Sequence, residues 1–273
     1  MKKFLVIASI LICMICAGCF QGKFDLIITD EGAVVRNWTV MGTAPFSRKI
    51  EEIKANNEKV FPNLRVKPVV EGEMLGYDFS LDYPDIETFA KEAHEKYIVH
   101  TGRNKGFSQR KGWFFDAYDF DFYVVYAPLN LPPEVGHLTQ AAFDSVVYDV
   151  TFQLPYSADK HNADKFDAAN KVLTWNLAPV LIHGGERYIN ARFKIWHKDK
   201  IALTTAVEIL LLAATIFFFR KARVEESESL KKDFRFKRNV FAGLFLALAI
   251  ISAYMLLAPV NFTDADIISA AAP

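Results

Sequence analysis

Apolar and polar residues divide this chain into three long apolar blocks and a patterned region between the first two. The apolar blocks cover residues 4–19, 201–219 and 240–258. Because a helix rises about 1.5 Å per residue, the second and third blocks are each about long enough to cross ~30 Å of hydrocarbon. The pattern therefore predicts two transmembrane helices, at 200–220 and 240–259.

Basic residues separate the two predicted transmembrane helices. The segment 220–239 holds eight Lys or Arg residues, whereas the tail 260–273 holds none. Since basic loops remain on the cytoplasmic side of a membrane, we expect 221–239 to be a cytoplasmic loop and the tail to lie outside. Lys2 and Lys3 place the extreme N-terminus inside, so the region 19–199 is expected to be an exported domain.

The first apolar block has the layout of a bacterial signal peptide. Two lysines precede it, and the small residues Ala17 and Gly18 precede Cys19. This end resembles the lipobox of bacterial lipoproteins, which predicts a signal peptide over 1–18 and lipidation of Cys19. An uncleaved signal anchor is the alternative, because the block, at 16 residues, is only slightly short for a span. All three cysteines of the chain lie in this block, so none remains for a disulfide or a thiolate metal site further along.

Two hairpins are predicted in the first half of the exported region. Strand-like segments 24–29 and 33–40 flank Asp30-Glu31-Gly32, a turn sequence with glycine. Segments 63–71 and 75–82 flank a second glycine turn. Short helices are expected to begin at Ser47 and at Pro84, because apolar residues then recur at three-to-four spacing.

The second half of the exported region is also rich in strand patterns. We expect strands over 113–126 and 146–154, and a hairpin of 172–177 and 188–196 around His183-Gly184-Gly185. The fold class expected is α+β: a curved, mainly antiparallel sheet with two helices, of a lipid-binding-like kind, followed by a two-helix transmembrane hairpin. Because 113–126 carries aromatic residues on both faces, part of it needs an apolar neighbour. The apolar stripe Ile86, Phe89 and Ala93 of the helix from Pro84, a hydrophobic ligand between that helix and the sheet, or the membrane would supply one.

Several short motifs resemble those of the LppM-like bacterial lipoproteins. They are the lipobox, the hairpin from Phe24-Asp25-Leu26 to Gly32, Leu154-Pro155, Asn162-Ala163 and Leu173-Thr174-Trp175-Asn176-Leu177, followed by a transmembrane helix. The resemblance covers roughly residues 15–220. It implies a curved sheet whose interior accepts a lipid or another hydrophobic ligand, and it brings no catalytic residues. The second transmembrane helix and the charged loop depart from the one-span pattern of that family.

Composition and motifs exclude several classes of function. Lys+Arg and Asp+Glu balance at 32 each, so nothing indicates a nucleic-acid partner. No catalytic nucleophile, cofactor-binding glycine pattern or close histidine pair for a metal occurs, so we expect no enzyme, no cofactor and no metal. The acids Asp116, Asp119 and Asp121 could form a carboxylate or calcium site, or simply be solvated acids of a sheet edge. Glu208, inside the first transmembrane helix, is a candidate polar packing site against Ser252 or Tyr254.

These observations predict a membrane-anchored envelope lipoprotein of the bacterial cytoplasmic (inner) membrane, with its main domain on the extracytoplasmic side. The exported domain is expected to bind a lipid or another hydrophobic ligand without catalysis. The alternative is a structural or assembly module that docks another envelope protein. Membrane lipids are the expected partners in the first case, and an envelope protein is the expected partner in the second.

Overall fold

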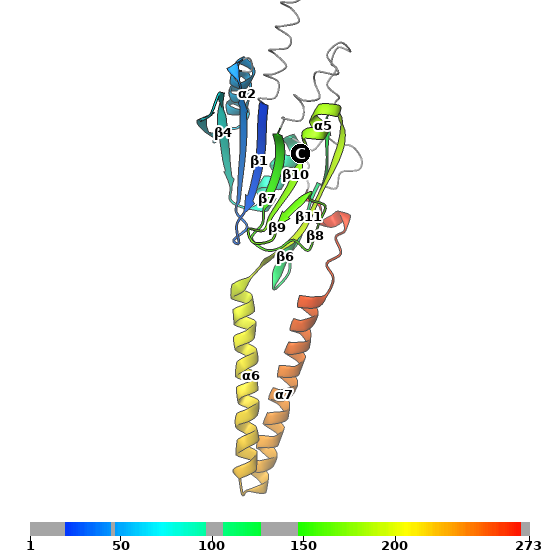
Figure 1. Cartoon of the computed structure of the whole chain (residues 1–273). Coiled ribbons are helices and arrows are strands. Elements are labelled where there is room, and N and C mark those ends of the chain that lie inside the picture. The colour runs from blue at the N-terminus through cyan, green and yellow to red at the C-terminus, as the bar shows by residue number, and fades with distance from the viewer. Residues whose placement is uncertain (1–19, 45–46, 97–105, 127–146, 269–273) are drawn as a thin grey trace, which may run out of the picture. The chain divides into compact units, whose positions relative to one another are not determined.

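The computed structural model describes residues 20–44, 47–96, 106–126 and 147–268, and the statements below concern these residues. The chain forms two compact units. The first, which we call the sheet domain, consists of Met1–Gln109, Tyr118–Ile195 and Thr263–Pro273. The second, which we call the helical unit, consists of Arg110–Ala117 and Trp196–Phe262. Figure 1 shows the elements of both units.

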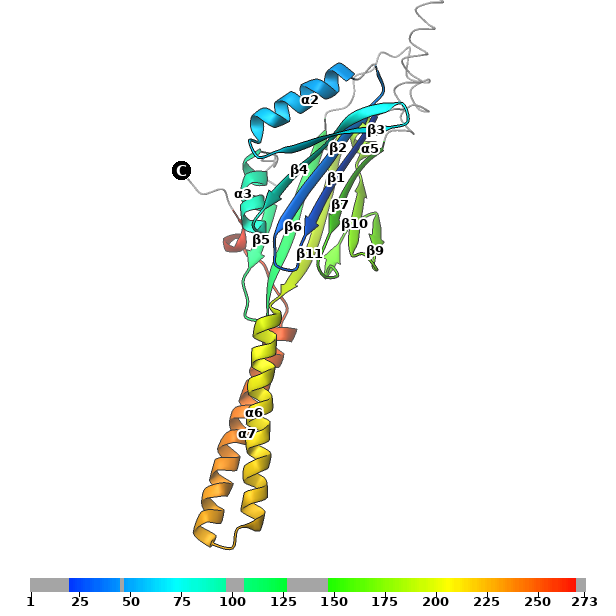
Figure 2. The ribbon, with the colours of Figure 1, turned by 90° about the vertical axis from the view of Figure 1, so that its left-hand side faces the viewer.

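A seven-stranded sheet forms one layer of the sheet domain. Its strands lie in the order β3-β4-β2-β1-β7-β10-β9. Their bounds are β1 Phe20–Ile28, β2 Val34–Gly42, β3 Arg65–Glu71, β4 Met74–Tyr83, β7 Val147–Gln153, β9 Lys165–Asp167 and β10 Val172–Asn176. Figure 2 shows β4, β2, β1 and β7 side by side in this sheet. The pairing is antiparallel except between β1 and β7, which run parallel.

The two hairpins expected in the first half are confirmed. β1 pairs with β2 in a continuous register from Phe20↔Gly42 to Ile28↔Val34, and β3 pairs with β4 in the same way. Gly32 and Gly72, in the two turns, have φ angles of +88° and +59°. Such positive φ angles favour glycine, so the turn residues help to set both registers.

A four-stranded sheet faces the larger one. Its order is β5-β6-β11-β8, with bounds β5 Gly106–Arg110, β6 Phe115–Tyr126, β8 Lys160–His161 and β11 Gly185–Trp196. Aromatic rings join the two layers: Phe120 of β6 contacts Phe152 of β7 at 5.7 Å between centroids, and Phe193 of β11 contacts Phe120 at 5.3 Å. All three side chains are fully buried, so the core lies between the sheets.

Three short helices complete the sheet domain. They are α2 Ser47–Val60, α3 Ile86–Lys96 and α5 Ala178–His183. α2 begins at the predicted Ser47, whereas α3 begins two residues after the expected Pro84 and buries Ile86, Phe89 and Ala90 of its apolar stripe. A 3-10 turn, η3 Asp264–Asp266, is followed by Ile268, whose backbone N–H donates to the carbonyl of Phe107 at 2.8 Å. The α+β class predicted from the sequence is confirmed, with the strands divided between two sheets.

The expected hairpin of 172–177 and 188–196 is wrong. β10 pairs with β7 and β9 in the larger sheet, whereas β11 pairs in the smaller one. The connection between them contains α5, which has a proline in its first turn, and ends at Gly184 and Gly185, with φ angles of +72° and +111°. The glycines therefore direct the chain from a helix into a new sheet rather than back along the same one.

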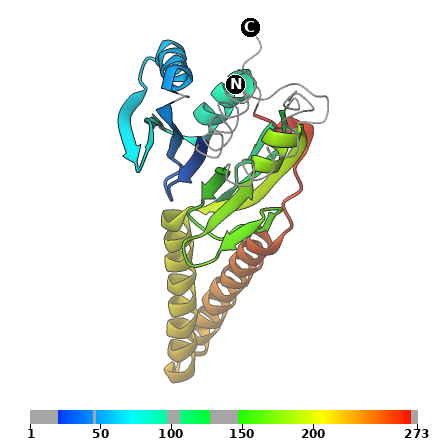
Figure 3. The same cartoon turned by 45° about the horizontal axis from the view of Figure 1, so that its top comes forward.

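The helical unit contains two long antiparallel helices, α6 Lys198–Val224 and α7 Glu228–Leu257 (Figure 1 and Figure 3). Both are long and apolar enough to cross a membrane. The segment 221–239, expected to be a loop, is helical except at 225–227. Its charged residues are good helix formers, so the helices continue beyond their apolar parts and leave only a short turn. The packing of Phe218 against Phe241 at 5.5 Å joins the two helices near this turn.

Candidate functional site

An apolar pocket of about 360 Å³ opens inside the sheet domain. Both sheets contribute to its wall, and α3 adds one aromatic ring. The lining residues are Lys23, Phe24, Leu26, Arg36, Trp38, Thr39, Val40, Asn57, Phe89, Phe107, Phe122, Tyr123, Val124, Val125, Tyr148, Val150, Phe152, Leu177 and Ile189. Its volume falls within the range of about 300–1,000 Å³ that is usual for small-molecule sites.

Strand alternation explains why these residues meet. Successive side chains of a strand point to opposite faces, so Phe24 and Leu26 of β1 face the same way, as do Val150 and Phe152 of β7. β1 and β7 are paired in register, with Phe24 opposite Val150 and Leu26 opposite Phe152. These four apolar side chains therefore form a continuous patch on the inner face of the larger sheet.

At the pocket, side chains do not completely fill the core of the sheet domain. Leu26 and Phe152 are 1% exposed, whereas Phe24, Trp38 and Phe122 are only partly buried although they pack against the core. Phe122 belongs to β6 and the other residues belong to β1, β2 and β7, so the space lies between the two layers. A native core is normally filled to a high density, and an open apolar space of this size is suited to a hydrophobic ligand.

Arg36 places one buried cation in the pocket wall. The residue is 5% exposed, and its guanidinium carbon lies 4.3 Å from the ring centre of Trp38 and 5.1 Å from that of Phe61. One guanidinium nitrogen lies 3.7 Å from a carboxylate oxygen of Glu92. Stacking on aromatic faces and an ion pair with α3 compensate the cost of burying this charge.

Tyr83 completes the polar group around Arg36. Its hydroxyl donates to Glu92 at 2.7 Å and accepts from Arg36 at 3.4 Å. Burial, followed by the hydrogen bond to Glu92, raises the pKa of Tyr83 far above its ordinary value. The phenol therefore stays protonated and holds Glu92 beside Arg36, so Arg36 is a fixed cation in a mainly apolar wall.

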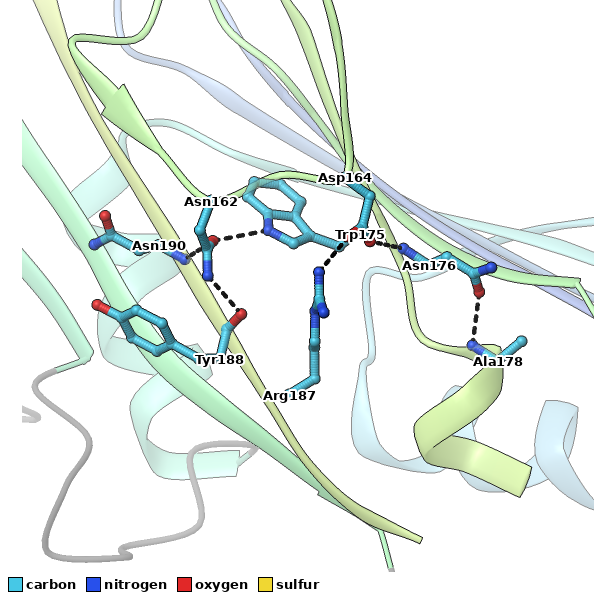
Figure 4. Close-up of polar contacts among 8 residues, drawn as sticks. All are labelled: Asn162, Asp164, Trp175, Asn176, Ala178, Arg187, Tyr188 and Asn190. Atoms are coloured by element: carbon cyan, nitrogen blue, oxygen red, sulfur yellow. Dashed lines mark hydrogen bonds and ion pairs between the residues drawn. The ribbon is translucent and has the colours of Figure 1, made fainter. Parts of the chain in front are cut away.

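A second polar cluster joins the two sheets (Figure 4). The amide oxygen of Asn162 accepts from the indole N–H of Trp175 at 2.9 Å and from the backbone N–H of Asn190 at 2.8 Å, and its amide nitrogen donates to the carbonyl of Tyr188 at 2.9 Å. Trp175 is in the larger sheet, and the other two partners are in the smaller one. Asn162 and Trp175, which belong to separate motifs of the sequence, thus meet as one structural link.

Asp164 reinforces the same link. One of its oxygens accepts from the backbone N–H of Asn176 at 2.9 Å, and the other pairs with Arg187. The side-chain oxygen of Asn176 in turn accepts from the backbone N–H of Ala178, at the start of α5 (Figure 4). The cluster therefore fixes the connection between β10 and β11 and is a structural element rather than a site for a ligand.

The three acids of β6 do not gather into an ion site. Asp119, 8% exposed, pairs with Arg192 at 2.6 Å and also accepts from Asn190. Asp116, in the helical unit, lies 3.5 Å from His197. Asp121 interacts with Tyr188 instead: burial first, and the charge of Asp121 second, raise the pKa of the Tyr188 phenol to about 12. Among the residues that the structure describes, no group of three or more His, Cys, Asp or Glu side chains could hold a metal ion.

Cys19 and Glu208 are the two remaining candidate residues. Cys19 lies outside the described residues, directly before β1. Glu208, in α6, accepts a hydrogen bond of 3.0 Å from the hydroxyl of Ser252 in α7, one of the two neighbours expected for it. In two antiparallel helices the residue numbers rise along one helix and fall along the other, so the numbers of facing residues have a nearly constant sum. The pairs Glu208–Ser252 and Phe218–Phe241 meet this condition and therefore fit one register.

The fold and the pocket define an α+β domain with an internal apolar cavity, in a chain that also contains two helices long and apolar enough to cross a membrane. The chain is similar to the folded domain of LppM from Mycobacterium tuberculosis, solved by NMR, with 10% sequence identity and a TM-score of 0.38. That similarity covers 67% of this chain and 93% of the other. No family model and no curated protein matches the chain.

Sequence reasoning missed most of the pocket wall. It expected a ligand between the sheet and the helix from Pro84, yet α3 contributes only Phe89, and the remaining wall comes mainly from strands of the two sheets. Arg36 gave no signal, since an arginine in an alternating strand is usually exposed. The one available clue was the excess of aromatic residues in 113–126, two of which, Phe122 and Tyr123, line the pocket.

Proposed function

We propose that this chain is an LppM-like envelope lipoprotein whose sheet domain binds a lipid or another hydrophobic ligand without catalysing a reaction. The observation that carries this proposal is the pocket of about 360 Å³ between the two sheets, with its largely aromatic and aliphatic wall. Burying a methylene group from water contributes about 0.8 kcal/mol. An acyl chain that fills the pocket gains this for each methylene, and its polar end can lie at Arg36 or at the rim near Lys23.

The proposed location is the bacterial inner membrane, with the sheet domain outside the cytoplasm. Two features support it: the apolar parts of α6 and α7, and the eight basic residues around the turn between them. Lipidation at Cys19 would add a third anchor immediately before β1.

Photo-crosslinking of the full chain tests the binding proposal. Cells that produce the protein are fed a fatty acid that carries both a diazirine and an alkyne, irradiated, and the labelled protein is digested with trypsin. We expect label on the peptide Phe24–Arg36, which contributes Phe24, Leu26 and Arg36 to the pocket wall. The peptide Ile201–Arg220, from α6, should be labelled by the surrounding bilayer and serves as an internal standard.

Two substitutions on one strand provide the matched comparison. Val150→Trp fills the pocket, because Val150 is a wall residue, whereas Val147→Trp puts the same ring on a side chain that is 45% exposed and outside the wall. We expect V150W to lower the label on Phe24–Arg36 several-fold relative to Ile201–Arg220, and V147W to leave that ratio unchanged. An unchanged ratio in folded V150W would overturn the binding proposal and favour a docking module for another envelope protein.

A further inference from the structure

A small part of the β structure belongs to the helical unit. Residues 110–117, which we call the hairpin tip, comprise the end of β5, the turn and the start of β6. Phe114, Phe115 and Ala117 of the tip are buried in a cluster of their own, against Trp196, Ile201, Val260 and Phe262. The tip thus packs on the first turn of α6 and on the segment that follows α7.

Trp113 lies on the outside of this cluster. Its indole N–H donates to the hydroxyl of Thr204 at 3.3 Å, and the ammonium of Lys200 lies 5.4 Å from its ring centre. The side chain nevertheless remains 50% exposed. An exposed tryptophan ring that keeps a hydrogen bond for its N–H has the amphipathic character that favours the boundary between water and hydrocarbon.

Thr204 gives the depth of this ring along α6. The apolar part of α6 begins at Ile201, and Thr204 follows three residues later, a rise of about 4.5 Å along the helix. When α6 crosses a bilayer, the first turn of its apolar part lies at the lipid headgroups and the upper acyl chains. Trp113, bonded to Thr204, then lies at that same level.

The tip is held at several points. The guanidinium of Arg110 donates to the carbonyl of Asn261 at 2.7 Å, after the end of α7, and the backbone N–H of His197 donates to the carbonyl of Phe114 at 2.8 Å. A Cβ at Gly112 would lie 2.5 Å from the carbonyl oxygen of Phe115, so the turn is too tight for another residue. With contacts to both helix ends, the depth of the tip is set by the helices.

Basic side chains accompany Trp113. Arg110 and Lys111 in the tip and Lys198 at the start of α6 are exposed, and Lys200 beside the ring is partly exposed. Asp199 and Asp116 bring the balance of these six residues to +2, from four positive and two negative charges. Ammonium and guanidinium groups around an interfacial aromatic ring suit the phosphates of lipid headgroups.

From these contacts, we infer that the hairpin tip is a membrane-surface anchor: it sits in the phospholipid headgroup layer, with Trp113 at the boundary with the acyl chains. The occupant of this surface is therefore the bilayer that α6 and α7 cross. The inference rests on the membrane-spanning part of the proposed function and is independent of the ligand pocket.

Tryptophan quenching by brominated lipids tests the inference on the full chain. The protein and its Trp113→Phe variant are reconstituted in phosphatidylcholine–phosphatidylglycerol vesicles made with brominated lipids. In one preparation the bromine atoms lie near the headgroups, and in the other they lie near the bilayer centre. The difference between the two emission spectra gives the contribution of Trp113. We expect this contribution to be quenched strongly by the shallow bromines and weakly by the deep ones.

The Trp175→Phe variant is the control, because Trp175 is fully buried in the sheet domain and does not line the pocket. The contribution of Trp175, obtained in the same way, should show little quenching with either lipid. Absence of shallow quenching for Trp113, in vesicles where α6 peptides are protected from protease, would overturn the inference. If W113F does not fold, Trp113→Tyr gives the same difference spectrum, since it keeps an aromatic ring at the position.

Discussion

Replacing Asn162 by alanine should weaken the link between the two sheets, because this one side chain forms hydrogen bonds to both. The substitution removes three hydrogen bonds, to Trp175, Asn190 and Tyr188. Two of the groups that lose their hydrogen-bond partner belong to residues that are almost completely buried, Trp175 at 0% and Asn190 at 5% exposed. Asn162 itself is exposed, so water can reach the site and replace part of what is lost.

The expected cost follows from these facts. Three typical hydrogen bonds contribute about 0.5–1.5 kcal/mol each, and replacement by water at an exposed site puts the loss near the lower part of the sum. We expect Asn162→Ala to lower the free energy of unfolding by about 1–3 kcal/mol, which corresponds to a fall in Tm of roughly 3–10 °C for a domain of this size. Asn162→Asp keeps an acceptor for Trp175 and loses the donor to Tyr188, so its cost should be smaller.

Urea-dependent pulse proteolysis of the full chain in detergent micelles measures this change in the sheet domain. The matched control is Asn56→Ala, an exposed asparagine in α2, where alanine should leave stability unchanged or raise it by about 0.5 kcal/mol because it favours a helix. If the free energies of unfolding of N162A and N56A differ by less than about 0.5 kcal/mol, then Asn162 does not link the sheets and the reasoning is wrong.

Three further predictions concern a helix cap, the N-terminus and the topology. The carboxylate of Asp85 accepts from the backbone N–H of Thr88 at 2.7 Å, and this bond lowers the pKa of Asp85. Asp85→Ala should therefore lower the free energy of unfolding by about 0.5–2 kcal/mol at neutral pH. Because the pKa of Asp85 is lower in the folded chain than its unfolded value of ~3.9, measurements of unfolding against pH should show this loss disappearing as the pH falls through the folded pKa. Cys19→Ala should abolish incorporation of radiolabelled palmitate, and label that persists would contradict lipidation at this residue. Reporter fusions should show cytoplasmic activity at Glu226, in the turn between α6 and α7, and exported activity at Ala271; the opposite result at either position contradicts the topology.

Local sequence signals were sufficient for the elements whose determinants lie close together. The first hairpin follows from the strand-like segments on either side of Gly32, and α3 follows from the apolar residues that recur at three-to-four spacing after Pro84. The apolar parts of α6 and α7 stand out because no other described segment is as long and as apolar. In each case the deciding residues belong to one continuous segment of the chain.

Long-range pairing was beyond such signals. β1 pairs with β7, more than one hundred positions away, and nothing near either strand shows this. β10 and β11 look like a hairpin because two strand patterns flank a glycine turn, whereas α5 and the contacts of Asn162 separate them into two sheets. β8 and β9 are two and three residues long, too short for any periodicity to appear. The pocket depends on where the two sheets diverge, and therefore on all these pairings together.

The direction of the first and last strands has a mechanical consequence. Lys23 of β1 pairs with Asp149, Asp149 pairs with Asn176, and Asn176 is joined through Asp164 to Arg187 near the start of β11. β1 and β11 therefore begin at the same end of the sheet domain.

The 12 residues of β11 then extend roughly 40 Å before α6 begins. An acyl chain on Cys19 and the helix α6 would thus attach to opposite ends of the sheet domain, one through the larger sheet and the other through the smaller sheet. Lipidation of Cys19 would therefore give the sheet domain two membrane anchors that are separated by the length of a strand.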